Sequence, residues 1–284
     1  MKVGIALSGG GIRGIAHAGV LKGLEENDIK IEAIGGTSAG GLVAALYAMG
    51  YSPYYIYTLF KRYAKEIVNV NSNPIIAELA RYMMNKETKL NGLNTGENLE
   101  KLFNEMAKRK NITKIKDIKM PIVIPAVDIM KSQEYVFTNN IPDSFDDKEK
   151  YIEEISVGKA IRASSSFPVA FCPCNYKKYI FMDGGVLNNV PVREVKKQGV
   201  DKVIAVKFES DAINEDSSMM DIMMKTLDIM NDRISEENIN DSDYTLTVKT
   251  DKTGLLDLDK MSSCYKYGYK AVINEIEKIK KAIE

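Results

Sequence analysis

The sequence predicts an α/β fold in which helices cover both faces of a mainly parallel sheet. Three observations predict it. Short apolar stretches of strand length alternate with longer helical stretches along the 284 residues. Glycine clusters stand where a predicted strand gives way to a predicted helix, at 9–14 and at 36–40. The apolar run at 202–208 is typical of a strand that is buried on both faces.

The N-terminal part of the chain predicts two strand–helix units. A strand at 2–7 leads through the first glycine cluster into a helix at 15–26, and a strand at 31–34 leads into a helix at 39–49. The helix at 39–49 is apolar on every side, which predicts a buried helix. It is far shorter than the roughly 20 residues needed to cross a bilayer. We therefore expect it to run under the centre of the domain.

The remaining elements follow from local signals. Ser52-Pro53 supplies a cap and a first-turn proline for a helix that reaches about Val70, and Asn73-Pro74 repeats the device. Thr95-Gly96-Glu97 opens a helix through about Lys108. Further strands are expected at 121–129, 134–138, 179–182, 202–208 and 244–249, a polar loop at 139–150, and helices at 151–163, 191–199 and on both sides of the last strand.

The composition fits one globular domain. Apolar residues make up 45% of the chain, which is ample for a large core. No repeat, low-complexity tract or linker divides it. We expect a single domain over residues 1–284, with a motif-bearing part at about 3–208 that the C-terminal part completes.

Charge and cysteine content exclude several classes of protein. The chain has 39 Lys and Arg against 39 Asp and Glu, so it lacks the basic excess expected of a nucleic-acid-binding protein. Three cysteines and one histidine provide neither a disulfide framework nor a structural zinc site, and we expect no metal and no organic cofactor. No signal-peptide core precedes the first strand. The expected location is the cytosol.

The strongest local motif is Gly36-Thr37-Ser38-Ala39-Gly40, a G-x-S-x-G sequence between a predicted strand and a predicted helix. In a sharp turn of this kind, side chains at the two glycines would be in the way, and the serine is thrust up at a helix N-terminus. The free N–H groups and the helix dipole there favour developing negative charge. The motif predicts a nucleophilic serine, with a glycine-rich turn capped by Ser38 as the alternative.

A nucleophilic serine needs a base, and the chain has only one histidine. His17 precedes Ser38 and lies inside the first predicted helix, where a packed histidine is the simpler interpretation. The best carboxylate is Asp183, which ends the strand at 179–182 and is followed by the tight turn Gly184-Gly185. The carboxyl ends of strands are where α/β sheets build their sites. Asp183 is therefore the predicted base, and a plain turn-forming aspartate is the alternative.

The cluster Gly9-Gly10-Gly11-Ile12-Arg13-Gly14 follows the first strand and satisfies G-x-G-x-x-G. A dinucleotide site would need an acidic residue at the end of the second strand, and Glu32 has the spacing but lies near the start of that strand. The same glycines can instead direct backbone N–H groups at one oxygen, as an oxyanion hole does. Arg13 would then hold the loop or add positive potential, with a surface ion pair as the alternative.

The order of these motifs resembles the patatin-like phospholipases. The likeness extends to Gly19-Val20-Leu21, to Ala160-x-x-Ala163-Ser164-x-x-x-Pro168 and to Asn188-Asn189-x-Pro191. The resemblance implies a three-layer α/β/α fold with a mainly parallel sheet, a Ser38-Asp183 dyad without histidine, and hydrolysis of acyl esters of lipids. It implies a lipid or acyl-ester substrate and no cofactor. From about Asp211 onward the resemblance adds nothing.

Two other functions stay open at this point. One is a nucleotide-binding oxidoreductase built on the loop at 9–14, and the other is an inert lipid-binding module that uses the same pocket. Headgroup and acyl-chain preference, positional specificity and oligomeric state are left open, as is transient contact with a membrane or micelle surface.

Three weaker features carry two interpretations each. The tyrosine-rich segment 51–63 and the methionine-rich segment 219–230 predict core packing, or alternatively a lid or acyl-chain wall. The basic run at 108–119 predicts a solvated face, or alternatively a contact with anionic headgroups. The methionine-rich segment comprises Met219, Met220, Met223, Met224, Leu227 and Met230.

Overall fold

A central sheet organises the computed structural model, which describes residues 1–284 except 69–93, 142–146, 169, 210–218, 251–252 and 254–257. In the described part of the chain the strands follow the order β5-β4-β3-β2-β1-β8-β9, with β7 paired to β3 and β6 paired to β7. Their bounds are β1 Val3–Leu7, β2 Ile31–Gly36, β3 Ile122–Asp128, β4 Gln133–Thr138, β5 Tyr151–Ile152, β6 Cys174–Tyr176, β7 Tyr179–Asp183, β8 Lys202–Phe208 and β9 Tyr244–Val248.

The centre of the sheet is parallel, as predicted. β1 pairs in parallel with β2 on one side and with β8 on the other, and the parallel pairs β2–β3 and β8–β9 extend the sheet in both directions. The strands β4 and β7 instead run antiparallel to β3. All five residues of β1 are buried, as expected for a strand covered on both faces.

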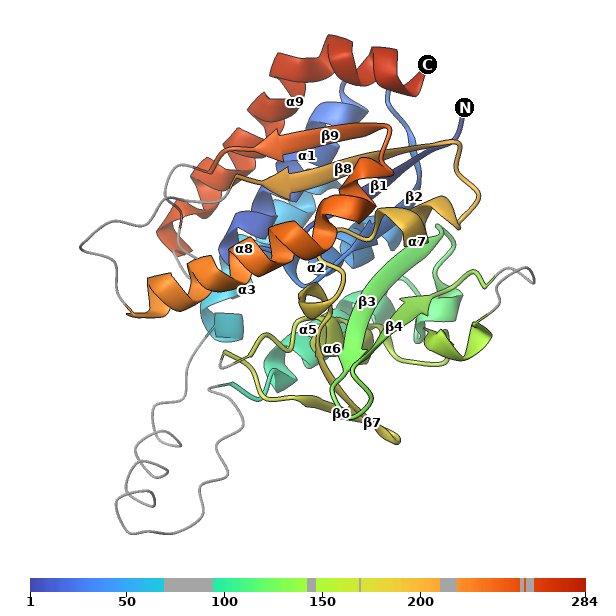
Figure 1. Ribbon diagram of the computed structural model, residues 1–284, viewed down its shortest axis with the longest axis vertical. Coiled ribbons are helices and arrows are strands. Elements are labelled where there is room, and N and C mark those ends of the chain that lie inside the picture. Colours follow the sequence, from blue (N-terminus) through green and yellow to red (C-terminus); the bar gives the residue numbers. More distant parts are fainter. Residues whose placement is uncertain (69–93, 142–146, 169, 210–218, 251–252, 254–257) are drawn as a thin grey trace.

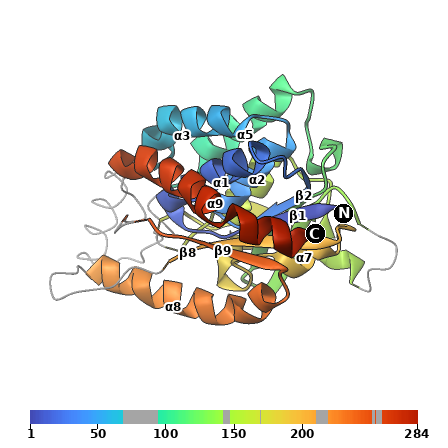
Figure 2. The same ribbon diagram turned by 90° about the horizontal axis from the view of Figure 1, so that it is seen from above.

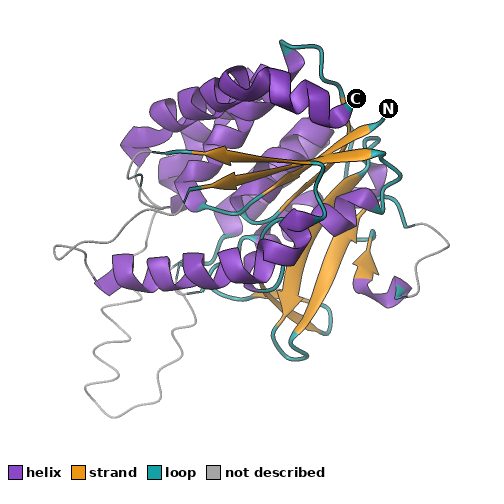
Figure 3. Cartoon of the chain, turned by 45° about the horizontal axis from the view of Figure 1, so that its top comes forward, coloured by secondary structure: helices purple, strands orange, loops and turns teal. Residues whose placement is uncertain are grey.

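Helices lie on both faces of the sheet and complete three layers (Figures 1 and 2). Figure 3 shows the strands sandwiched between the two helical layers. One face carries α1 Ala16–Glu25, α2 Ala39–Ala48, α3 Pro53–Val68, α5 Glu97–Arg109 and α9 Met261–Ile283. The other carries α7 Val192–Lys196 and α8 Met219–Asn240. The three-layer α/β/α architecture expected from the resemblance is confirmed.

Alternate strand residues divide the apolar core between the two faces. Ile5, Leu7 and Ile34 belong to the larger cluster, whereas Ala6 and Ala33 belong to a smaller cluster. The smaller cluster also contains Val192 and Val195 of α7. The small side chains of the strands on that face let the short helix α7 pack close to the sheet.

The C-terminal helix packs directly against the helix that follows the glycine loop. A Cβ atom at Gly19 of α1 would lie 2.0 Å from the carbonyl oxygen of Tyr265, and one at Gly268 of α9 would lie 1.9 Å from that of Ala16. Only glycine permits this approach at both positions. The described residues of both parts of the chain thus share one sheet and one core, while the single-domain assignment over 1–284 stays a prediction.

The predicted helix at 151–163 is wrong over residues 151–156. Tyr151 and Ile152 form β5, which pairs with β4, and the helix α6 spans only Val157–Ser164. It begins there because the Ser156 side chain accepts a hydrogen bond from the N–H of Lys159 and caps the helix. The short strand β6 was not predicted, and Asn73-Pro74 lies outside the described residues.

None of the helices that the structure describes is long and apolar enough to cross a membrane. The buried helix predicted at 39–49 is α2, in which Ala39, Tyr47 and the flanking Ser38 alone have intermediate exposure. Its position between β2 and the outer helices agrees with the all-round apolar sequence.

Candidate active site

The turn between β2 and α2 holds Ser38 in a rare backbone conformation. Its φ is 52° and its ψ is −120°, a combination that non-glycine residues seldom adopt. The N–H of Ser38 donates to the Oγ of Ser164 at 3.1 Å. Neighbouring Thr37 is buried, and its hydroxyl donates to the carbonyl oxygen of Asn188 at 2.8 Å. These two hydrogen bonds hold the turn from both sides of the serine.

The glycines of this turn are required by space. A Cβ atom at Gly36 would lie 2.4 Å from the backbone of Gly40, and one at Gly40 would lie 2.4 Å from the carbonyl oxygen of Leu7. The left-handed conformation falls on Ser38 itself. Side chains at Gly36 and Gly40 would therefore be in the way, as the G-x-S-x-G motif predicts.

Asp183 ends β7 and is buried, with 2% of its surface exposed. Its Oδ1 accepts a hydrogen bond from the N–H of Gly185 at 2.8 Å, which forms the predicted tight turn. Gly184 is needed here because a Cβ atom would lie 2.4 Å from the carbonyl oxygen of Pro125. Within the described residues, the other oxygen, Oδ2, is buried without a hydrogen bond of standard geometry.

Burial raises the pKa of Asp183 from its ordinary value to about 6. The Ser38 hydroxyl and the Gly185 N–H act in the opposite direction, because both stabilise the ionised carboxylate. The structure thus brings Ser38 and Asp183 together. The prediction placed Asp183 at the carboxyl edge of the sheet. Instead, β7 runs antiparallel to β3, and Asp183 lies opposite Ala126 in the middle of β3.

The glycine loop lies against the same serine. A Cβ atom at Gly9 would come within 3.4 Å of the Ser38 Cβ, and one at Gly14 would come within 2.4 Å of the Ala39 Cβ. The loop continues into a 3-10 helix over Gly11–Ile15. The first N–H groups of such a helix have no acceptor within the helix. The N–H groups of Gly10, Gly11 and Ile12 therefore have no acceptor within the helix, and each can donate to an oxygen outside it.

The N–H of Gly9 has a different use. It donates to the side-chain oxygen of Asn189 at 3.0 Å and to its backbone oxygen at 3.3 Å. Gly9 is therefore already engaged. The rest of the predicted oxyanion donor set consists of Gly10, Gly11, Ile12, Arg13 and Gly14. In the sequence, Asn189 and Ser164 stand out only as parts of the motifs that carry the family resemblance, and no local signal predicts a role for either of them.

His17 is fully buried in α1, as the simpler interpretation predicted. Its Nε2 lies 2.8 Å from the carbonyl oxygen of Ser8, so Nε2 carries the proton and donates it. The ring packs against Phe208 with centroids 4.7 Å apart. Burial lowers the pKa of His17 to about 4, which keeps the imidazole neutral at physiological pH. His17 therefore supports the glycine loop through its hydrogen bond to the Ser8 carbonyl oxygen.

Arg13 holds the loop, which is one of its two predicted roles, and it also forms an ion pair. Its Nε donates to the carbonyl oxygen of Gly10 at 3.3 Å, and its guanidinium forms an ion pair of 3.3 Å with Asp228 of α8. The Arg13 side chain is 6% exposed and that of Asp228 is 27% exposed, so the ion pair is partly buried and differs from the fully exposed pair of the alternative.

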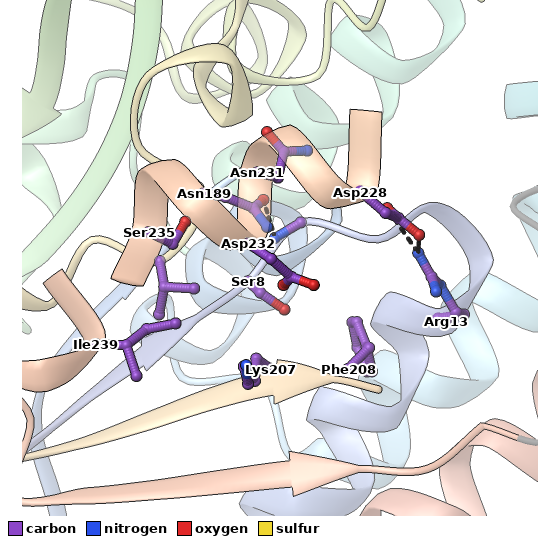
Figure 4. Close-up of a pocket in the computed structure, with 12 residues that line it drawn as sticks. Ser8, Arg13, Asn189, Lys207, Phe208, Asp228, Asn231, Asp232, Ser235 and Ile239 are labelled. Atoms are coloured by element: carbon purple, nitrogen blue, oxygen red, sulfur yellow. Dashed lines mark hydrogen bonds and ion pairs between the residues drawn. The ribbon is translucent and has the colours of Figure 1, made fainter. Parts of the chain in front are cut away.

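A pocket lies between the loop and α8 (Figure 4). Figure 4 shows Asp232 of α8 pointing towards Ser8, and Asp228 of the same helix pointing towards Arg13. The hydroxyls of Ser8 and Ser235 are buried without a partner among the described residues. The complete lining is Ser8, Gly9, Arg13, Asn189, Val190, Lys207, Phe208, Asp228, Asn231, Asp232, Ser235 and Ile239, so the pocket abuts Ser38 only through Gly9.

The acidic residue required by a dinucleotide site is in the wrong place. Glu32 lies at the start of β2 and pairs with Lys30 at 2.6 Å. The carboxyl end of β2 leads into the Ser38 turn. The loop at 9–14 therefore borders the Ser38 turn, and the end of β2 offers the nucleotide interpretation no acidic residue.

The three weaker features have different outcomes, and the tyrosine-rich segment is the one that packs against the core. Five aromatic residues of segment 51–63 pack against the core, and Tyr54 is 62% exposed. In the basic run at 108–119, Lys114 and Lys116 pair with Glu154 on an exposed face. Met230 is 52% exposed, whereas the side chains of Met219, Met220, Met223, Met224 and Leu227 lie outside the described ones.

Comparisons with known proteins add a family. A family model described as patatin-like phospholipase matches residues 5–196. The chain is 32% identical over 214 residues to lysophospholipase NTE1 of Meyerozyma guilliermondii and 31% identical over 214 residues to that of Candida albicans. Each alignment covers 73% of this chain and 13% of the relative, so the chain spans only a small part of these proteins.

Two solved structures share the fold. VipD from Legionella pneumophila aligns with a TM-score of 0.52 and 14% identity, covering 98% of this chain and 67% of that one. The ExoU–SpcU complex of Pseudomonas aeruginosa aligns with a TM-score of 0.55 and 20% identity, covering 98% of this chain and 51% of that one. At these identities the likeness concerns the architecture alone.

Proposed function

The chain belongs to the patatin-like phospholipase family, and from this premise we propose that it hydrolyses carboxylic esters of lipids through Ser38 and Asp183. The relatives it matches are named lysophospholipases, which makes a lysophospholipid the first substrate to test. One observation carries the proposal. The buried Oδ2 of Asp183, which has no partner of standard geometry in the described chain, belongs to a carboxylate that the Ser38 hydroxyl already influences.

In the proposed reaction, Oδ2 of Asp183 accepts the proton of the Ser38 hydroxyl as the Ser38 Oγ attacks the ester carbonyl carbon. The carbonyl oxygen becomes an oxyanion, and N–H groups of Gly10 and Gly11 donate to it. Collapse of this intermediate breaks the bond to the alcohol, which takes the proton from Asp183. A water molecule that gives a proton to Asp183 then attacks the acyl carbon; the bond from this carbon to the Ser38 Oγ breaks, Asp183 returns the proton to Oγ, and the carboxylic acid leaves.

The raised pKa of Asp183 supports its role as the base. A carboxylate of ordinary pKa is a weak base at neutral pH, and a general base works best when its pKa lies near the working pH. Burial brings that of Asp183 to about 6. A carboxylate also needs no third residue to select a tautomer, which is the task of the acid in a Ser-His-Asp triad. Two residues therefore suffice.

In the proposal, the protein is cytosolic and binds its substrate at the surface of a membrane or micelle. The reaction uses no nucleic acid, no metal and no organic cofactor. Exposed Val186 and Leu187 follow the Asp183 turn directly and give this side of the molecule apolar surface. This contact is transient in the proposal.

A fluorophosphonate probe tests the proposal, because only an activated serine reacts with it. We expect labelling of the folded protein at Ser38 by peptide mapping, and loss of labelling in Ser38→Ala. Ser132→Ala is the control, since it removes an exposed hydroxyl from the turn between β3 and β4 and leaves the contacts of Ser38 unchanged. Hydrolysis is then measured on a series of esters of increasing chain length and on a lysophospholipid. A protein that binds lipid but neither reacts nor hydrolyses would be an inert binding module.

A further inference from the structure

The oxyanion loop contains two peptide units that are held in different ways. The unit joining Ser8 and Gly9 is fixed at both ends, because the Ser8 carbonyl accepts from His17 and the Gly9 N–H donates to Asn189. The unit joining Gly10 and Gly11 is held at its carbonyl, which accepts from the Nε of Arg13 at 3.3 Å. In a trans peptide the carbonyl and the N–H point in opposite directions. The bond from Arg13 therefore aims the Gly11 N–H away from Arg13.

The backbone constrains this unit only in part, because the Gly10 carbonyl is the first acceptor of the 3-10 helix Gly11–Ile15. Gly10 has a φ of 155° and Gly11 a φ of 58°, both in regions that glycine enters freely. A Cβ atom at Gly10 would lie 2.6 Å from the ring of Phe208, so a stiffer residue cannot replace it. The bond from the Arg13 Nε is a second restraint on the same carbonyl, and it narrows the freedom that these two glycines leave to the Gly11 N–H.

Arg13 is itself held by a residue outside the loop, Asp228 of α8. The Arg13 guanidinium lies 3.3 and 3.4 Å from the two carboxylate oxygens of Asp228 and 5.7 Å from the centre of the Phe208 ring. Figure 4 shows Asp228 reaching from α8 to Arg13 across the mouth of the pocket. An ion pair of this kind is worth more when its members are shielded, and Arg13 is buried.

We propose that Asp228 is a positioning residue for the reaction: it holds Arg13, and Arg13 holds the Gly10 carbonyl so that the Gly11 N–H meets the oxyanion. The inference rests on the proposed function. Asp228 lies on α8, beyond the residues 5–196 that the family model matches, so it ties the C-terminal part of the chain to the proposed site.

The test is the steady-state hydrolysis of a soluble ester by Asp228→Asn, which keeps the shape of the side chain and removes its charge. We expect kcat to fall about ten-fold with KM unchanged, because a misdirected donor costs part of the factor of about 100 lost with a missing one. Asp228→Glu should recover much of the loss. Arg13→Lys should show a similar fall in kcat, because an ammonium lacks the fork that reaches Gly10 and Asp228 together.

Asp232→Asn is the matched control. Asp232 lies one turn further along α8 and lines the same pocket, and its charge also acts on that of Arg13. We expect its kcat to stay within about two-fold of the wild type, since the inference concerns a hydrogen-bonded contact and not the field of the pocket. Denaturant midpoints measured on every variant separate a loss of folding from a loss of turnover.

Two results would overturn the inference alone: Asp228→Asn with normal kcat, or Asp228→Asn and Asp232→Asn with equal losses, in a wild type whose hydrolysis depends on Ser38. A wild type without Ser38-dependent hydrolysis would overturn the proposed function, and this inference with it. A fall in kcat confined to Asp228→Asn and Arg13→Lys, and recovered by Asp228→Glu, supports it.

Discussion

His17 and Asp183 are the two residues weighed as the base for Ser38, and burial shifts their pKa values in opposite directions. Both side chains are almost completely enclosed, and each has one atom without a partner among the described residues, Nδ1 of His17 and Oδ2 of Asp183. Burial pushes each towards its neutral form, lowering the pKa of His17 to about 4 and raising that of Asp183 to about 6.

The surroundings of the two groups explain why only one of them is the proposed base. The proton of His17 is committed to the Ser8 carbonyl, and its ring is covered by Phe208. Asp183 has its Oδ1 fixed by Gly185, while the Ser38 hydroxyl acts on the carboxylate. A buried ionisable residue thus becomes a catalytic candidate through the group that faces it, and the usual residue type for the task is a weaker guide.

The largest expected effect comes from removing the dyad. Ser38→Ala and Asp183→Asn should each lower kcat by a factor of about 10⁴, because the two side chains act as one unit. His17→Gln is the matched control and should retain most of the turnover per folded molecule. Ester hydrolysis normalised to folded protein by circular dichroism measures this. A dead but folded His17→Gln beside an active Asp183→Asn would reverse the assignment of the base.

A smaller loss is expected in the glycine loop that His17 supports. Gly10→Ala or Gly11→Ala should lower kcat by a factor of about 100 to 1000 on a soluble ester while leaving substrate affinity intact. Gly199→Ala is the control, because Gly199 also has a positive φ, of 80°, but no atom lies within 4 Å of its Cβ position. Normal turnover in both loop variants would put the oxyanion donors elsewhere.

The pH dependence of the reaction separates the two groups by their pKa values. If ionised Asp183 is the base, kcat/KM should rise about ten-fold per pH unit below pH 6 and level off above it. His17→Gln should leave this midpoint unchanged, since the pKa of His17 lies near 4. A midpoint that moves with His17→Gln would mean that the imidazole takes part in the titration.

Stability should depend on the two residues with opposite slopes. The raised pKa of Asp183 means that the folded state holds a proton between about pH 4 and 6 that the unfolded state releases, so stability declines as pH rises through this window. Asp183→Asn removes that slope and should stabilise the protein by about 1 to 3 kcal/mol at pH 7. Denaturant unfolding of wild type and variant at pH 4 and pH 7 measures the difference.

For His17 the sign is reversed. Its lowered pKa means that the unfolded state binds the proton first, so the stabilising contribution is present above pH 6.5 and is lost as pH falls towards 4. His17→Gln should therefore be less sensitive to acid in this window than the wild type, although it loses the contact with Phe208. Equal acid sensitivity of the two proteins would contradict the buried, neutral state of His17.

The smallest expected effect is that of chelation. Because the proposed reaction uses a serine, a carboxylate and backbone N–H groups, ester hydrolysis should be the same with and without EDTA. A loss of activity that calcium or zinc restores would contradict the proposed chemistry.

Local sequence determined the elements and the residues that carry chemistry. The glycines at 36 and 40, the serine between them and the aspartate before Gly184-Gly185 are all readable from spacing, because each belongs to a turn formed by neighbours in the chain. The same holds for the helices that begin at Pro53 and at Glu97. Where pairing with a distant strand decided the conformation, as at Tyr151 and Ile152, the local signal failed.

Only the tertiary structure decided how these residues are held. Gly9 meets Asn189 across 180 positions of sequence, and Arg13 meets Asp228 across 215. Because β7 runs antiparallel to β3, Asp183 lies opposite Ala126 in the middle of β3. A fully parallel sheet would have placed it at the carboxyl edge. Contacts of this range depend on which strands and helices pack side by side, and a carboxylate on α8 has the same local sequence signal whether it faces an arginine or solvent.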